Sequence, residues 1–321
     1  MRLPPPAGGA LRVGSFRRTV SDLGRSIDFY CTGLGFSADR NDESDEAKLF
    51  ETSARSEPLR SARLTLGEQT LELIAPIGAE RHAGEERLGE SVADAGFQHF
   101  AIVTRDMNEA LGRLRHFAPR PISRGGAARL PAASGGATAF KFRDPDGHPL
   151  ELIAFAAGTG DPRWHEAGGD APTLGIDHTA LSVRDVAASL AFYEQELGLA
   201  LVARQTNRGP AQDALDGVDG AVVEVIALAP GAASTPHIEL LGYASPVPRA
   251  PPRREPLLAD HGDRTELLVA DLRSLAERLA VPPRGAAGAA ADLQDAAFID
   301  GGAVLLRDPD GHLLVLRQTP R

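Results

Sequence analysis

Phe142-Arg143-Asp144-Pro145-Asp146-Gly147-His148-Pro149-Leu150-Glu151 returns near the end of the chain as Leu306-Arg307-Asp308-Pro309-Asp310-Gly311-His312-Leu313-Leu314-Val315. In both copies Asp-Pro-Asp-Gly separates two apolar runs. This is turn chemistry, because proline presets φ, aspartate braces the turn and glycine adopts positive φ at no cost. The copies differ in the strand that follows, where Glu151 of the first is replaced by Val315 in the second. The repeat predicts a duplicated fold in which only one copy has kept a carboxylate.

Each half of the chain also contains two units, and the secondary-structure elements follow the same order in every unit. Each unit begins with an alternating strand, after which an aspartate opens a helix, and capping of the helix explains that aspartate without any further role. The strands are expected at residues 13–20, 99–104, 176–183 and 264–269, and the aspartates are Asp22, Asp106, Asp185 and Asp271. The pattern predicts an α+β fold of four βαβββ modules, numbered one to four along the chain.

The duplication divides the 321 residues almost in half, and a chain of this length is long for a single core. We predict a first domain at 1–157 and a second at 173–321, with two modules in each. The segment 158–172 between them is rich in glycine, which favours a linker.

Composition narrows the classes of function. A hydrophobic content of 42% and a charged content of 24% are typical of a globular protein that needs no disulfide, and a lone Cys31 favours a reducing compartment. The formal net charge of -10 argues against nucleic acid as a partner, because no basic stretch is present to neutralise phosphates. No apolar run approaches membrane-spanning length and the first residues lack a signal-peptide core, so we expect a cytoplasmic protein without a membrane partner.

Four motifs carry a resemblance to a known family. They are GIDHTALSVRD with LAFYEQELGL, TPHIELLGY, FQHFAIVTRDM and FRDPDGHPLELIAF. In this order they resemble the vicinal oxygen chelate superfamily, which includes glyoxalases, extradiol dioxygenases and the bleomycin- and fosfomycin-resistance proteins. The resemblance covers nearly the whole chain. It implies that modules pair into two cup-like mixed sheets, with a divalent metal ion held inside a cup by the first strand and one late strand of each paired module.

The resemblance assigns four positions of this chain to each cup. Modules two and three contribute His99, Glu151, His178 and Glu239, whereas modules one and four contribute Ser15, Glu72, Arg264 and Val315. Pairing within each half would damage both sites. Pairing across the halves, which resembles the exchanged arrangement of dimeric glyoxalases, gathers every good ligand in one cup, and we therefore predict one intact and one degenerate site.

The degenerate cup allows a sharper prediction. Arg264 and Glu72 would both project into it, and a guanidinium in the place of a cation would satisfy the carboxylate.

Two imidazoles and two carboxylates suit a borderline divalent ion. The candidates are nickel, cobalt, zinc, iron(II) and manganese. The mechanism that the resemblance implies is polarisation of a carbonyl or of two adjacent oxygens, with Glu151 or Glu239 as the catalytic base. His237, two residues before Glu239, is expected to share its face of the strand and to serve as a reserve ligand. Ser182 and Tyr243 are expected in the substrate pocket, which the segments 41–57 and 207–218 are expected to shape.

Three functions follow from this set. The first is a metal-dependent, glyoxalase-like lyase or isomerase acting on a small molecule with adjacent oxygens. Relatives that use glutathione carry arginine and asparagine where this chain has Ser182 and Tyr243, which argues against a glutathione conjugate. The second is an extradiol-type ring-cleaving dioxygenase with iron(II), and the third is a non-catalytic binding or resistance protein. One chain holds all four modules, which favours a monomer, with a homodimer as the alternative.

Overall fold

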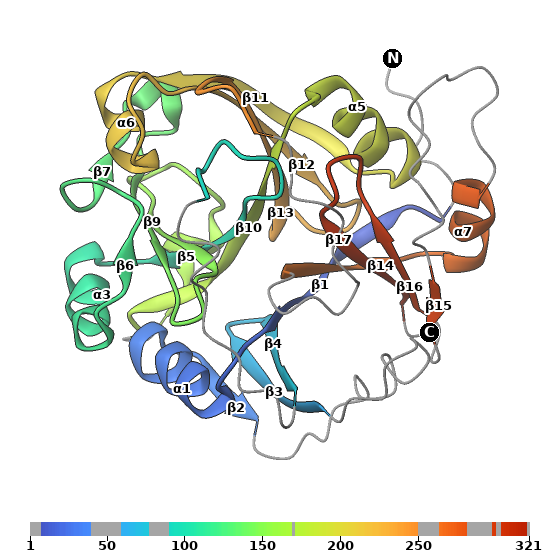
Figure 1. Ribbon diagram of the computed structural model, residues 1–321, viewed down its shortest axis with the longest axis horizontal. Helices are drawn as coiled ribbons and strands as arrows, with labels where there is room; N and C mark the ends of the chain where they lie inside the picture. Colours follow the sequence, from blue (N-terminus) through green and yellow to red (C-terminus); the bar gives the residue numbers. More distant parts are fainter. Residues whose placement is uncertain are drawn as a thin grey trace.

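The computed structural model of the chain describes residues 8–39, 59–76, 90–168, 171–249, 263–280, 297–299 and 303–319. Within these residues the chain forms two sheets, and residues of the principal helices pack into the same hydrophobic core as the strands of both sheets (Figure 1). Sheet A has the order β15 (Ala297–Ile299), β16 (Ala303–Arg307), β17 (Leu313–Gln318), β14 (Asp263–Val269), β1 (Ala10–Thr19), β4 (Gln69–Pro76), β3 (Leu59–Leu66) and β2 (Ser37–Asp39). Sheet B has the order β11 (Ala200–Arg208), β12 (Val222–Ala229), β13 (His237–Ser245), β10 (Thr173–Val183), β5 (Gln98–Thr104), β9 (Pro149–Ala154), β8 (Thr138–Arg143) and β6 (Arg120–Pro121), with β7 (Ala128–Arg129) paired to β8.

Each sheet is assembled from both halves of the chain. Sheet A joins β1 of module one to β14 of module four, and sheet B joins β5 of module two to β10 of module three, both antiparallel. Within each module the first strand pairs in parallel with a late strand, as in β5 with β9 and β10 with β13. The modules therefore pair across the halves, and both halves contribute to both sheets. The domain limits at 157 and 173 stay a prediction.

The helices begin where the sequence places an aspartate. The principal ones are α1 (Leu23–Asp28), α3 (Met107–Leu114), α5 (Val186–Ala191) and α7 (Leu272–Ala280), and π-helical turns at Phe29–Gly33 and Phe192–Glu196 extend α1 and α5. The side chains of Asp22, Asp106, Asp185 and Asp271 each accept a hydrogen bond from a backbone N–H of the first turn. The capping role expected of these aspartates is confirmed.

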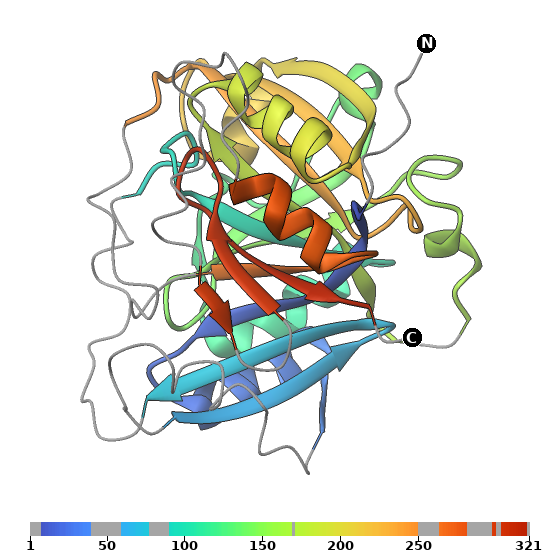
Figure 2. The same cartoon turned by 90° about the vertical axis from the view of Figure 1, so that its right-hand side faces the viewer.

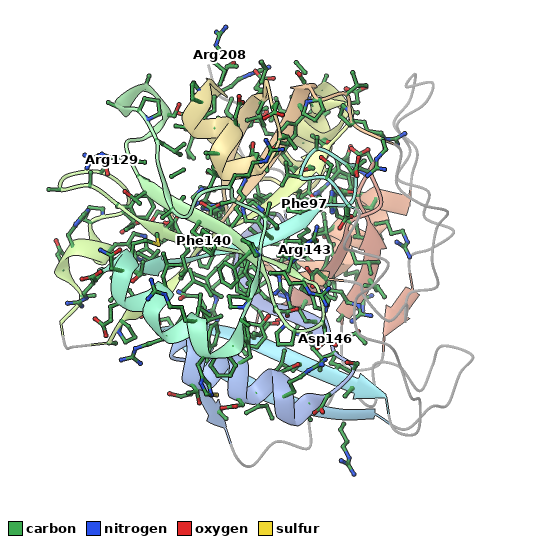
Figure 3. All side chains as sticks on the ribbon, turned by 60° about the vertical axis from the view of Figure 1, so that its left-hand side comes forward. Phe97, Arg129, Phe140, Arg143, Asp146 and Arg208 are labelled. Carbon is green, nitrogen blue, oxygen red and sulfur yellow. The ribbon has the colours of Figure 1, made fainter. Side chains whose placement is uncertain are left out.

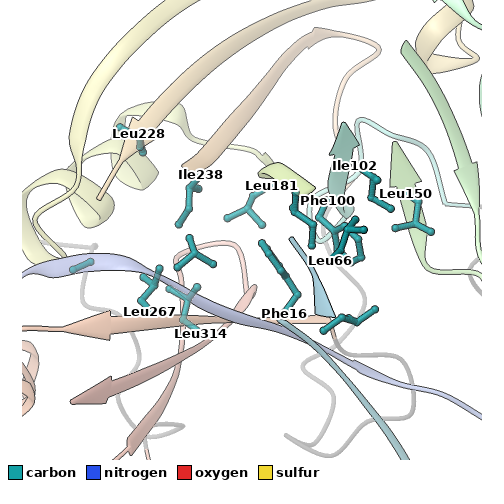
Figure 4. Packing of buried hydrophobic residues seen from close by; sticks show 14 of the residues in the cluster. Phe16, Leu66, Phe100, Ile102, Leu150, Leu181, Leu228, Ile238, Leu267 and Leu314 are labelled. Carbon is teal, nitrogen blue, oxygen red and sulfur yellow. The ribbon is translucent and has the colours of Figure 1, made fainter. Parts of the chain in front are cut away.

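The main hydrophobic core lies between the two sheets. Figure 4 shows Phe16, Leu267 and Leu314 of sheet A opposite Leu181, Ile238 and Phe100 of sheet B. The rings of Phe16 and Phe100 have their centroids 5.2 Å apart. Because side chains alternate along a strand, the residues next to these point to the opposite face of each sheet, into its concave side. The core packing thus fixes which residues line the two cups.

The repeated Asp-Pro-Asp-Gly-His turns join the modules within each half. In the first copy Asp144 accepts a hydrogen bond of 2.7 Å from Tyr30 Oη, and Asp146 accepts one of 3.0 Å from Ser26 Oγ of α1. His148 Nε2 lies 2.9 Å from the Thr19 carbonyl oxygen, so this histidine belongs to the turn. Asp146 lies beside α1 in Figure 3.

The second turn repeats these contacts. Asp308 accepts from Tyr193 Oη at 3.0 Å, Asp310 accepts from Arg184 Nε at 2.8 Å, and His312 Nε2 lies 3.1 Å from the Ser182 carbonyl oxygen. Gly147 and Gly311 have φ of +85° and +101°, a conformation in which a side chain would be strained. The turns hold α1 and α5 against the sheets by equivalent bonds.

The segment expected as a linker includes the short helix α4 (Arg163–Glu166), and Trp164 within it is buried. A further helix, α6 (Pro210–Asp216), lies in the segment 207–218 that was expected to shape the pocket. The segment 41–57 lies outside the described residues.

None of the helices in the described part of the chain is long and apolar enough to cross a bilayer. Figure 2 shows α7 and α5 on the same side of the molecule.

Candidate metal centre

Four adjacent strands of sheet B bring His99, Glu151, His178 and Glu239 together. Strand β5 carries His99 and β10 carries His178, and in their antiparallel register Ala180 lies opposite His99 and Ala101 opposite His178. Glu151 on β9 pairs with Ala101, and Glu239 on β13 pairs with Ala180. Neighbours in register share a face, so the two small alanines leave the centre of this face to the four ligand-type side chains.

The four side chains form a continuous chain of contacts. His99 Nε2 lies 3.0 Å from Glu151 Oε2, and His178 Nε2 lies 3.5 Å from Glu239 Oε2. The ligand atoms of His99, Glu151 and His178 all lie within 4.8 Å of one another. Glu239 is the most open of the set, because its side chain is 20% exposed whereas that of Glu151 is 6% exposed.

His99 has the features of a metal ligand. Neither of its buried ring nitrogens makes a hydrogen bond of favourable geometry within the described residues, although Nε2 is close to Glu151. Burial lowers the pKa of His99, which keeps the imidazole neutral as coordination requires. A buried polar atom without a partner is costly in a folded protein, and a cation would satisfy it.

The remaining three groups have strongly coupled charges. Burial opposes the charge of Glu239, but His178 and His237 lower its pKa to about 2. Burial likewise opposes the charge of His178, but Glu239 and Asp177 raise its pKa to about 9. Although burial opposes ionisation of Glu151, the neighbouring His99 and Lys141 hold its pKa below the ordinary value. The cup therefore holds two carboxylates in their ionised, ligand-competent form.

Asp177 orients His178, a role that was not predicted from the sequence. The register between Ile176 and His178 shifts by one residue, which marks a β-bulge at Asp177. Asp177 Oδ2 lies 3.0 Å from His178 Nδ1, and Asp177 Oδ1 accepts a hydrogen bond of 2.7 Å from Trp164 Nε1. A carboxylate bound to the far nitrogen of a histidine is the usual partner of a metal-ligating imidazole. In a regular strand these neighbours would point to opposite faces, so no sequence periodicity reveals the pair.

His237 lies on the same face, beside His178. The two residues are in register on parallel strands with ring centroids 5.3 Å apart, and His237 Nε2 lies 3.4 Å from Glu239 Oε1. His237, His178 and Asp177 form a second group of ligand type, which shares His178 with the first. Its role as a reserve ligand stays a prediction.

Ser182 and Tyr243, expected in the substrate pocket, both bond to protein groups. Ser182 is fully buried and its hydroxyl donates to the Val92 carbonyl oxygen. Tyr243 donates a hydrogen bond of 2.9 Å to Asp216 Oδ2 at the end of α6. The segment 207–218 therefore reaches the cup through a helix.

Lys141 is a charged residue of this cup that was not predicted from the sequence. It lies on β8 in register with Glu151, and its Nζ is 2.7 Å from Asp216 Oδ1 and 4.0 Å from Glu151 Oε2. One signal was present in the sequence: the chain has two lysines, Lys48 and Lys141, and uses arginine for every other cation of this kind. Lys141, which is followed by the buried Phe142, lies in the strand next to the proposed ligand Glu151. A lysine at this position was therefore an exception to the use of arginine in this chain.

In the other cup, residues of sheet A occupy the equivalent positions. Arg17 pairs with Glu72 as Ala180 pairs with Glu239, and Glu266 pairs with Val315 as Ala101 pairs with Glu151. The two alanines of the first cup are thus replaced by Arg17 and Glu266, whose side chains meet at 2.7 Å. An ion pair fills the space that sheet B leaves open.

The guanidinium that meets Glu72 is that of Arg17, not that of Arg264 as expected. Arg17 Nε lies 3.2 Å from Glu72 Oε2 and donates to Ser15 Oγ at 3.3 Å. Arg63 Nη2 also lies 3.4 Å from Glu72 Oε1. Arg264 is buried nearby, and its burial and the positive charge of Arg17 lower its pKa to about 10. Arg17 and Glu266 each lie two residues after a ligand position of a first strand, outside the four positions that the resemblance assigns to this cup, so the pair was not predicted.

Comparisons with known proteins agree with this architecture. Lactoylglutathione lyase GLX1 of Arabidopsis thaliana is 26% identical over 185 residues, which are 57% of this chain and 53% of that protein. The alignment thus spans about half the length of that curated relative. Crystal structures of glyoxalase I from Zea mays and of one of its point mutants each have a TM-score of 0.59 at 18% identity. The former covers 95% of this chain and 91% of the maize chain, and the latter 96% and 93%, so the fold is shared over nearly the whole length.

The family itself is shown by a match to both halves. The sequence model of the family described as the Glyoxalase/Bleomycin resistance protein/Dioxygenase superfamily matches residues 12–152 and residues 175–316. These ranges contain all four modules with their cup-lining residues. The chain therefore belongs to the Glyoxalase/Bleomycin resistance protein/Dioxygenase superfamily.

Proposed function

We propose that this chain is a metal-dependent enzyme of its superfamily, a glyoxalase-like lyase or isomerase that acts on a small molecule with two adjacent oxygens. The observation that carries the proposal is the convergence of His99, Glu151, His178 and Glu239 on one face of sheet B, with Nδ1 of the buried His99 lacking a hydrogen-bond partner within the described residues. The divalent ion would be nickel, cobalt, zinc, iron(II) or manganese. When bound, it would supply Lewis acidity to a carbonyl or to two neighbouring oxygens.

The protein groups of the cup differ in what they contribute. His99 and His178 are fixed, the latter by Asp177, and they would hold the centre in place. Glu239 is the more open carboxylate and lies at the His237 side of the cup, which suits it to take a proton from the carbon next to the carbonyl and to return it at the adjacent carbon. Glu151 is enclosed by His99 and Lys141 and suits a permanent ligand. Both glutamates remain our candidates for the catalytic base.

A glutathione conjugate is not the substrate that these residues favour. The name of the Arabidopsis relative includes that substrate class. In this chain, however, the hydroxyl groups of Ser182 and Tyr243 donate hydrogen bonds to Val92 and Asp216. This supports a different small molecule.

Iron(II)-dependent ring cleavage is the second candidate. It is favoured by the compactness of His99, Glu151 and His178, whose ligand atoms all lie within 4.8 Å of one another while Glu239 is more exposed. Two histidines and one carboxylate on one face suit an iron centre of this kind. A non-catalytic binding protein is the third candidate, in which the same cup would retain its ligand unchanged.

Metal analysis tests these candidates. Protein purified without chelators is expected to contain close to one equivalent of a divalent ion, and Glu151→Gln is expected to lower that content strongly. Glu72→Gln is the control, because Glu72 occupies in the other cup the position of Glu239 in this one, and its replacement should leave the metal content unchanged. Equal metal loss in both variants would contradict the assignment of the site.

Activity assays then separate the functions. The loaded protein is assayed on hemithioacetals, catechols and hydroquinones with each of the five ions. Conversion of a hemithioacetal with nickel, cobalt or zinc supports the lyase or isomerase. Oxygen consumption with a catechol and iron(II) supports the dioxygenase, and binding without turnover supports the third candidate. A protein that neither holds nor takes up any of the ions would overturn both enzyme proposals.

A further inference from the structure

We propose that Lys141 binds a negatively charged oxygen of the substrate, which makes the substrate a small 2-hydroxy or 2-oxo acid. The inference rests on the proposed function, since it takes the metal centre as the place where two adjacent substrate oxygens bind. It adds the charge of the molecule and a residue that recognises it.

Lys141 points into the cup that holds the four ligand-type residues. It lies opposite Glu151 in the antiparallel pair of β8 and β9, so the two side chains share a face. Its Nζ is 4.0 Å from Glu151 Oε2, the same oxygen that lies 3.0 Å from His99 Nε2. The ammonium group is therefore a near neighbour of the metal centre.

The ammonium group has hydrogen-bond donors to spare. A lysine carries three N–H donors, and the side chain of Lys141 is only 5% exposed. Among the residues that the structure describes, Asp216 is the single hydrogen-bond acceptor of Nζ, because Glu151 at 4.0 Å is too far for a hydrogen bond. Buried charges are costly unless their donors are satisfied. The remaining donors call for an acceptor that the cup receives from outside.

The ion pair with Asp216 is not needed to attach α6. Ser123 Oγ donates to the Leu215 carbonyl oxygen at 2.8 Å, and Arg124 N donates to the Ala214 carbonyl oxygen at 2.8 Å, and these bonds already attach the helix to module two. Asp216 is held firmly, because its second oxygen accepts from Gln212 Nε2 at 2.7 Å and from Tyr243 Oη at 2.9 Å. The network thus holds the ammonium group in place while most of its donors stay available.

The other modules show that the fold does not demand a cation at this position. The residues in register with the other three late-strand positions are Ala227 in module three, Leu305 in module four and Arg63 in module one. Arg63 binds Glu72 directly, whereas Lys141 leaves Glu151 beyond hydrogen-bond distance. Lysine is a compact charge on a flexible stem, and it suits contact with a ligand oxygen where the arginine fork would engage the glutamate.

The position of Lys141 selects a chemical class. A substrate whose two adjacent oxygens bind in the cup next to Glu151 would place one of them, or a carboxylate oxygen bonded to the same carbon, near the ammonium group. A 2-hydroxy or 2-oxo carboxylate carries its negative charge there. A neutral molecule of the same shape would leave the buried donors unsatisfied, and rejection of such an analogue is expected to be strong.

The test compares glycolate with glycolamide, which have the same size and adjacent oxygens but differ in charge. Binding of each probe to the cobalt-loaded protein is measured by calorimetry. The ratio of the two affinities is compared among variants, so that the intrinsic preference of the ion cancels. Lys141→Met is expected to weaken glycolate binding by about 10- to 100-fold and to change glycolamide binding little, because a hydrogen bond to a charged group is lost. Arg204→Met, which removes an exposed cation on β11, is the control and should leave the ratio unchanged.

Asp216→Asn gives a second and opposite test. This change keeps a hydrogen-bond partner for Lys141 but removes the competing negative charge, so glycolate affinity is expected to rise by roughly 3- to 10-fold. If the ion pair served only to attach α6, the affinity would be unchanged or would fall. An unchanged ratio in Lys141→Met, or an equal loss of both probes with cobalt still bound, overturns the inference. Failure of the wild-type protein to take up cobalt overturns the proposed function instead.

Discussion

Asp177 connects the interior of the protein to the candidate metal centre. It accepts a hydrogen bond from Trp164 and contacts Nδ1 of His178, which leaves Nε2 of the same ring facing Glu239. The ring is thus fixed in one orientation by a residue outside the ligand set. This contact exists only because a β-bulge brings two consecutive side chains together.

Asp177→Asn is expected to weaken metal binding by about 10- to 100-fold while leaving the fold intact, because the amide has nearly the same shape but lacks the charge that supports the imidazole. The measurement is competition for cobalt with a chromophoric chelator. Asp28→Asn, which alters an aspartate bonded to Thr32 on the exposed side of α1, is the control. Equal affinities for wild type and Asp177→Asn would show that the orientation of His178 does not depend on this carboxylate.

Arg17 fills the degenerate cup and neutralises two buried carboxylates, Glu72 and Glu266. Removing Arg17 leaves Glu72 with Arg63 and Glu266 with Arg317, so the buried negative charge is then only partly compensated. Arg17→Ala is therefore expected to lower the free energy of unfolding by about 3 kcal/mol, measured by urea denaturation.

A matched change at an exposed pair should have a much smaller effect. Arg204 lies 2.7 Å from Glu224 with about half of its side chain in solvent, and Arg204→Ala provides this comparison. Metal content should be unchanged in both variants, because neither residue lies in the sheet B cup. A loss of metal in Arg17→Ala would mean that the two cups are coupled.

The first strand and the capped helix of each module could be predicted from the sequence. The side chains that fill the two cups could be predicted only in part. Alternating apolar residues and capping aspartates place the first strand and the helix of each module, because these signals are local. The bulge at Asp177 and the helix over 210–216 were not predicted, since both depend on partners far along the chain. The contact of Lys141 with Asp216 likewise joins modules two and three and has no local signature.

Asp146→Ala tests the turn as a structural element. Asp146 is buried and accepts from Ser26 Oγ, so its removal leaves a buried hydroxyl without its partner. We expect a loss of about 1 to 3 kcal/mol in the free energy of unfolding with metal content preserved. Asp310→Ala, the equivalent change in the second turn, should cost a similar amount because Arg184 and Ser189 bind there. Stability equal to wild type in both variants would refute the proposed role of the turns.

In the whole molecule, the crossed pairing of modules makes the two halves inseparable. Each sheet has its central antiparallel pair between strands of different halves, β1 with β14 and β5 with β10. A protease site inserted after Gly158, which is exposed between β9 and α4, should therefore allow cleavage without dissociation. The two fragments are expected to elute together in size-exclusion chromatography under native conditions and to separate in urea. Native separation of the fragments would show that the sheets do not hold the halves together.

Trp164 gives the protein a built-in optical reporter. It is the one tryptophan of the chain, it is buried, and its indole N–H is bonded to the carboxylate that contacts His178. Its fluorescence is expected to respond to any change of charge or occupancy at His178, with no label and no competing emitter of the same kind. Excitation of a single side chain can thus follow ligand entry into the sheet B cup in real time, in the unmodified protein.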